Sequence, residues 1–132
     1  MDSDVLVASF LESEARHADA RHYIDALENG DCIFHLPMLV PVEVVSAIWR
    51  RTQKLGVALV TRARISLQDW ESTGKMLLYP LTRERMDLGM DAALKYRLRG
   101  NDSIVASLAE ELGITLRTFD AEMQRRLPQA LP

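Results

Sequence analysis

The sequence is poor in cysteine, glycine, proline and aromatic residues, and these shortages exclude several classes of structure. A single cysteine, Cys32, in 132 residues excludes a disulfide framework and a cysteine-based zinc site. Six glycines and five prolines are too few for a collagen-like or low-complexity chain. No apolar run approaches the roughly 20 residues that span a bilayer, so we expect no membrane association and a cytoplasmic location.

An excess of positive charge is also missing. The chain has 16 Lys and Arg residues against 19 Asp and Glu residues, which gives a formal net charge of -3. This net charge does not attract nucleic acid, so any such binding requires local basic groups or bound cations. The hydrophobic fraction of 48% and the chain length suit one globular core, and we expect one domain over residues 1–132.

Apolar periodicity predicts helices and strands in alternation, with glycine and proline between them. This order indicates an α/β protein with a doubly wound parallel sheet that carries helices on both faces. The opening segment, 5–11, reads as a strand end that runs into a helix capped by Ser3 or Asp4. Helices are predicted over 15–27, 42–51, 58–70, 82–98, 102–112 and 121–127, and buried strands over 32–36, 76–79 and 114–119.

Four acidic residues, Asp2, Glu43, Asp102 and Asp120, fall near the predicted carboxyl ends of the strands. Open α/β sheets bind ligands at that edge, and the topology brings these distant residues to it. An aspartate there has a simpler explanation, because it can cap a helix and complement its dipole. Glu43 fits that explanation less well, because it lies in an apolar run where a buried carboxylate is costly.

A cluster of carboxylates is electrostatically unfavourable on its own. Two of them about 4 Å apart repel by roughly 4 kcal/mol at an effective dielectric constant near 20. They therefore raise each other's pKa, move apart, or bind a cation between them. Oxygen ligands favour Mg²⁺ or Mn²⁺ over zinc, and a pair of such ions is the usual device for phosphodiester hydrolysis.

Four segments spread over nearly the whole chain carry a family resemblance. They are DSDVLV at 2–7, VEVV at 42–45, LRGNDSIVA at 98–106 and LRTFD at 116–120. Each is common alone, but in this order and spacing they resemble the PIN-domain family of nucleases, and especially its VapC-type ribonuclease toxins. The resemblance implies a PIN-like fold and a metal-dependent endoribonuclease that hydrolyses RNA phosphodiester bonds.

The resemblance also implies partners and roles. The protein would be the toxin of a type II toxin–antitoxin pair, with a cognate antitoxin protein as partner, and would form a homodimer. The Mg²⁺ or Mn²⁺ ligands would be the catalytic residues, and two hydroxyls would support them. The implied ligands are Asp2, Glu43, Asp102 and Asp120, and the implied supporting residues are Ser3 and Thr118.

Two features depart from the family pattern. Asp4 stands where Asn or Ser is commoner, so it is either an additional acid or a helix cap. Only Met1 precedes Asp2, where family members have most of their first strand. The strand is therefore expected to use residues 2–6 or to begin upstream of them.

Basic residues gather in two stretches. Arg97 and Arg99 belong to the second stretch and lie close to Asp102 in sequence, so we favour them as contacts to RNA phosphates. The alternative is that both stretches are solvated helix faces. The first stretch contains Arg50, Arg51, Lys54, Arg62 and Arg64.

Two other interpretations share features with this sequence. A response-regulator receiver domain also places acids at strand ends, but it needs an Asp after its third strand and a Lys after its last. Here the strand at 76–79 ends in Pro80, and the last strand ends in Thr118-Phe119-Asp120. The second alternative is a catalytically inactive PIN fold that serves as a binding or interaction module.

Overall fold

The chain folds into seven helices and four short strands within the part that the structure describes. The computed structural model describes residues 1–53 and 55–132, and Lys54 lies outside them. The mixture of helices and parallel strands confirms the predicted α/β class. The helices are α1 Ser3–Phe10, α2 His17–Asn29, α3 Val40–Arg51, α4 Val57–Ser72, α5 Arg83–Tyr96, α6 Gly100–Leu112 and α7 Ala121–Arg126. The strands are β1 Phe34–Pro37, β2 Met76–Tyr79, β3 Leu116–Arg117 and β4 Ala130–Leu131.

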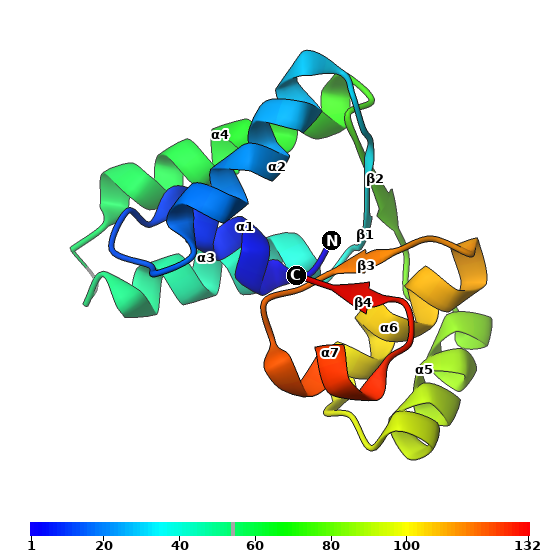
Figure 1. Cartoon of the computed structure of the whole chain (residues 1–132). Coiled ribbons are helices and arrows are strands. Elements are labelled where there is room, and N and C mark those ends of the chain that lie inside the picture. The colour runs from blue at the N-terminus through cyan, green and yellow to red at the C-terminus, as the bar shows by residue number, and fades with distance from the viewer. Residues whose placement is uncertain (54) are drawn as a thin grey trace.

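The described strands form two parallel pairs, β1 with β2 and β3 with β4. The segment Met1–Asp2 lies between the pairs and touches both, as the position of the N-terminus in Figure 1 shows. Its Met1 amine is 3.4 Å from the His35 carbonyl, and its Asp2 N–H donates to the Arg117 carbonyl over 2.9 Å. Met1 and the extended residue Asp2 thus occupy the middle position, and the predicted continuous sheet is divided there.

The prediction for the start of the chain is wrong in its details. Helix α1 begins at Ser3, so residues 2–6 do not form a strand. The capping residue is Asp2, whose Oδ1 accepts the Ser3 N–H over 2.6 Å, and not Ser3 or Asp4. The error has a physical cause. Residues 5–10 are all buried, and an apolar run without periodicity cannot distinguish a buried helix from a buried strand.

The six other predicted helices are present, and each bound lies within two residues of its prediction. Their ends follow the expected chemistry. Thr82 caps α5 by accepting the Arg85 N–H, and Gly30 and Gly113 end α2 and α6 with positive φ angles of 83° and 64°. The strand over 76–79 has the predicted bounds, while the predicted strands at 32–36 and 114–119 are shorter or shifted, and β4 was not predicted.

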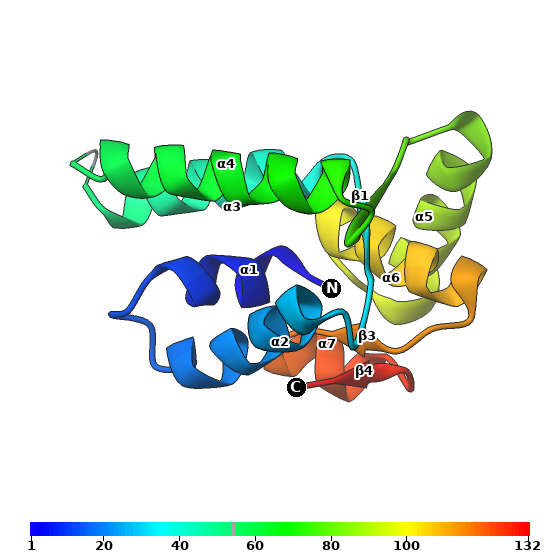
Figure 2. The same cartoon turned by 90° about the horizontal axis from the view of Figure 1, so that it is seen from above.

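Helix α1 lies at the centre of the hydrophobic core. It packs against both α2 and α3, and α3 and α4 run side by side as a long pair (Figure 2). Helices α5 and α6 form a second pair, in which Gly89 lies directly against the end of the Ile104 side chain. No helix in the two described ranges is long and apolar enough to cross a membrane.

The central position of α1 predicts which core substitution will be costly. Leu6 is completely buried, so Leu6→Ala should lower the free energy of unfolding by about 2–5 kcal/mol, through lost burial and a cavity. Leu94 is 82% exposed, so Leu94→Ala should change the free energy of unfolding by less than about 0.5 kcal/mol. Urea unfolding of the two variants and the wild type measures the difference. Equal effects would contradict the core described here.

Candidate functional site

The four predicted acids each lie at the N-terminal end of a helix. Asp2 caps α1 and Asp120 caps α7, while Glu43 and Asp102 lie in the first turns of α3 and α6. Helix N-termini carry partial positive charge, which favours carboxylates there. The convergence of four helix starts therefore lets the fold hold several acids near one another.

Thr118 connects two of the acids. Thr118 is completely buried, and its hydroxyl donates to Asp2 Oδ2 over 2.8 Å. The Thr118 hydroxyl oxygen also accepts the Asp120 N–H over 3.1 Å. The Oδ1 atom of Asp120 accepts the Glu122 N–H over 2.6 Å and so begins α7. The end of β3 and the start of α7 are thereby fixed beside the start of α1.

Glu43 and Asp102 are held differently. The Asn101 side-chain amide donates to Glu43 Oε1, which ties the start of α6 to the start of α3. The Asp102 carboxylate makes no hydrogen bond to any residue in the described ranges, and α6 has no side-chain cap. Helix capping, the simpler explanation offered by the sequence, therefore accounts for Asp2 and Asp120 but not for Asp102.

Electrostatics links all four acids. Burial raises the pKa of Asp2, and the charge of Asp120 adds to that rise. Burial raises the pKa of Glu43 as well, the charges of Asp2 and Asp102 contribute, and hydrogen bonds from Asn101 and Ser3 oppose the rise. For Asp102, burial again raises the pKa first, followed by the charges of Asp2 and Asp120. The deprotonated cluster is thus disfavoured until a cation balances it.

Asp4 is a fifth acid of the same group. Its Oδ2 accepts the Phe119 N–H over 2.8 Å and lies 3.3 Å from the Thr118 hydroxyl. Its Oδ1 is buried and has no hydrogen-bond partner among the described residues. Burial, and then the charge of Asp2, raises the pKa of Asp4 to about 7. Asp4 is therefore more than a surface acid, although it does not cap α1.

The donor set fits a hard divalent cation. All the acids offer carboxylate oxygens, the ligands that Mg²⁺ and Mn²⁺ favour, and Asp4 Oδ1 is a buried oxygen that lacks a partner. In the described ranges no three Asp, Glu, His or Cys side chains already form a group that could hold one ion. Repulsion among uncompensated carboxylates favours such a spread arrangement.

The basic residues named from the sequence differ in position. Arg99 precedes α6 and its charge lowers the pKa of Asp102, against the larger effects that raise it, so this side chain lies near the acids. Arg97 ends α5 in a left-handed conformation, and its carbonyl accepts a hydrogen bond from Arg126. Of the first basic stretch, Lys54 lies outside the described residues.

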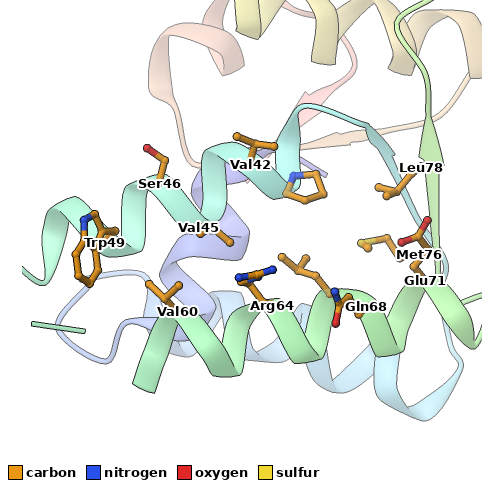
Figure 3. Close-up of a pocket in the computed structure, with 12 residues that line it drawn as sticks. Val42, Val45, Ser46, Trp49, Val60, Arg64, Gln68, Glu71, Met76 and Leu78 are labelled. Atoms are coloured by element: carbon orange, nitrogen blue, oxygen red, sulfur yellow. The ribbon is translucent and has the colours of Figure 1, made fainter. Parts of the chain in front are cut away.

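Two hollows flank helix α3. The polar pocket lies between α1 and α3, has a volume of about 410 Å³, and is lined by Ser3, Asp4, Glu43, Arg50 and Asn101 among others. The apolar groove lies on an adjacent face of α3, between α3, α4 and β2, and has a volume of about 500 Å³. Figure 3 shows its lining, which includes Val45, Trp49, Val60 and Met76.

The groove is the larger hollow, yet its lining suits a different task from that of the pocket. Its charged residues are Arg64 and Glu71, and none of the clustered acids belongs to it. Nearly all of its other lining side chains are apolar. We therefore place the chemistry beside the polar pocket and the acids, where titratable groups converge.

Comparison with known proteins agrees with this geometry. A family model described as PIN domain matches residues 1–128. The chain belongs to the PIN domain family. This membership confirms the family resemblance of the sequence motifs and excludes the receiver-domain alternative. No curated protein matches the sequence.

The PIN fold is also visible among solved structures. The chain is similar to VapC20 of Mycobacterium tuberculosis, described as a sarcin-ricin loop cleaving toxin, with a TM-score of 0.73. The two sequences are 13% identical, and the match covers 99% of this chain and 97% of that chain. At this identity the likeness shows a shared fold.

The sequence predicted the four acids near strand ends, but in the structure Asp102 follows helix α5 and not a strand. Sequence reasoning also missed two neighbours of the acids. Asn101 bonds to Glu43, and its place beside Asp102 in the third motif could have indicated it. Glu122 contributes to the rise in the pKa of Asp102 and pairs with Arg126 over 2.6 Å. Nothing in its local sequence separates Glu122 from an ordinary helix residue.

The raised pKa of Asp4 predicts an unusual pH dependence without metal. The folded state holds a proton on Asp4 that the unfolded chain releases above its ordinary pKa of 3.8. The contribution of Asp4 to stability is therefore greatest at low pH and declines as the pH rises through that window to about 7. Asp4→Asn should flatten the decline, which urea unfolding in EDTA at several pH values measures. The substitution Asp31→Asn, at an exposed position, should leave this decline unchanged. If Asp4→Asn also left the decline of stability with pH unchanged, the raised pKa of Asp4 would be contradicted.

Proposed function

We propose that this protein is a metal-dependent endoribonuclease that hydrolyses RNA phosphodiester bonds. The main support for this proposal is that acidic side chains from four helix starts converge, in a chain that belongs to the PIN domain family. The VapC20 neighbour is described as a sarcin-ricin loop cleaving toxin, which supports RNA as the substrate class and a toxin role in a type II pair. The proposal treats residues 1–132 as one nuclease domain.

The proposed metal ligands are the acids themselves. Asp2, Glu43, Asp102 and Asp120 would hold Mg²⁺ or Mn²⁺, which supplies an activated water and stabilises the leaving oxygen. Asp102, whose oxygens accept no protein hydrogen bond in the described ranges, has the most coordination capacity left.

The neighbouring groups position these acids. Thr118 fixes the orientation of Asp2 through its 2.8 Å hydrogen bond, and Asn101 fixes Glu43. Ser3 acts on the same glutamate. Arg99 is proposed as a phosphate contact, with Arg97 as a weaker candidate because its structural position is set by the end of α5.

Asp102→Asn tests the proposal. The substitution should abolish Mn²⁺-dependent cleavage of a labelled RNA, because it removes a charged ligand. In EDTA it should leave the protein as stable as the wild type or more stable, since one like charge leaves the cluster. Wild-type melting temperature should rise with millimolar Mn²⁺ through binding to the folded state alone.

The exposed Asp91→Asn is the matched control and should keep both cleavage and the Mn²⁺ shift. A wild type that shows the Mn²⁺ shift but cleaves no RNA would favour the alternative function, an inactive PIN fold that acts as a binding module. A wild type with neither property would refute the metal site.

An antitoxin protein and a second copy of the chain are the proposed partners, and the cytoplasm is the proposed location. Val42 is 70% exposed and lines both hollows, so a bound antitoxin segment could cover the apolar groove and approach the acids together.

Exposed Met86, Leu88 and Met90 on α5 support self-association. Light scattering should give twice the monomer mass of 14.9 kDa, and a monomer at all concentrations would contradict the dimer.

A further inference from the structure

The polar pocket has two ends of opposite charge. Asp4 and Glu43 line it together with Ser3 and Asn101, and Arg50 and Arg51 line it as well. Glu43 and Arg50 are seven residues apart on α3, which is two helical turns or roughly 10 Å along the axis. Both side chains therefore lie on the same face of the helix, and the pocket extends from the acids to a basic end.

The two arginines at that end differ in their partners. The Arg51 Nη1 donates to Glu14 Oε1 over 2.6 Å, so its charge is balanced within the protein. Arg50 has no carboxylate partner and no side-chain hydrogen bond among the described residues. Its side chain is exposed at the pocket, and the guanidinium donors remain available to a ligand.

The chemistry of the pocket suits a phosphodiester. An arginine guanidinium presents a planar fork of donors that matches two phosphate oxygens. Ser3, Ser46 and Asn101 add hydroxyl and amide groups that can bond to phosphate or ribose oxygens. The acids at the other end would meet the same ligand only through bound cations, because carboxylates repel phosphate.

We propose that the polar pocket binds an RNA phosphate adjacent to the one being cleaved, and that Arg50 holds it. This inference rests on the proposed ribonuclease function and adds the direction in which the RNA runs, along α3 from the acids toward its C-terminal end. Arg50 is thus a substrate-binding residue, which the sequence alone did not distinguish from the other arginines of its stretch.

The test measures RNA binding as a function of salt. Asp102→Asn serves as the background, so that a short single-stranded RNA oligonucleotide stays intact, and fluorescence anisotropy is recorded with Mn²⁺ present. Adding Arg50→Ala should weaken binding by roughly tenfold, as the loss of a charge-assisted contact predicts. It should lower the slope of log affinity against log salt concentration by about 0.7, the value for one phosphate contact to a single strand.

Two further variants separate a specific contact from a change in overall charge. Arg62→Ala, on the exposed face of α4 and outside the lining of both hollows, removes the same charge and should leave affinity and slope near those of the background. Arg50→Lys keeps the charge but loses the fork, so it should keep the slope while binding more weakly.

The outcomes distinguish this inference from the proposed function. If the wild type cleaves RNA and Arg50→Ala behaves like Arg62→Ala, the pocket is not a phosphate site and the nuclease proposal stands. If the wild type neither binds nor cleaves RNA, the proposed function fails and this inference fails with it. A specific loss in Arg50→Ala, with Mn²⁺ stabilisation unchanged, supports the pocket.

Discussion

The burial of several carboxylates near one another is the constraint on which the site depends. The fold places five acids at the starts of four helices, where helix dipoles and N–H groups partly offset their charge. The compensation is incomplete, because burial and mutual repulsion still raise the pKa of Asp2, Asp4 and Asp102. Such a cluster costs stability in the metal-free protein, and a divalent cation is the natural group to relieve that cost.

The sequence predicted the parts of this arrangement that local chemistry determines. Helix ends marked by Thr82, Gly30 and Gly113 were located because caps and left-handed glycines are local signals. The four acids were recognised because each follows a strand or begins a helix, and the α/β topology brings such positions together. Family membership then confirmed the resemblance that their order and spacing carried.

The parts that were missed depend on packing between distant segments. The opening segment was predicted to be a strand end that runs into a helix, whereas helix α1 begins at Ser3. Its residues from Val5 to Phe10 are all buried, so no periodicity distinguished a strand from a helix. Met1 and Asp2 occupy the space of a central strand through contacts with β1 and β3 that no local pattern reveals. Arg51 pairs with Glu14, whereas Arg50 has no such partner among the described residues and can contact a ligand. This difference between the two arginines is likewise a tertiary feature.

The central claim is that the acids at the four helix starts share a divalent cation. A crystal of the wild-type protein soaked in Mn²⁺ and measured for anomalous scattering tests it most directly. The account predicts an anomalous peak bounded by Asp2, Glu43, Asp102 and Asp120, with these carboxylates drawn closer together than they are here. Well-ordered carboxylates with no peak between them, or a peak elsewhere on the molecule alone, would contradict it.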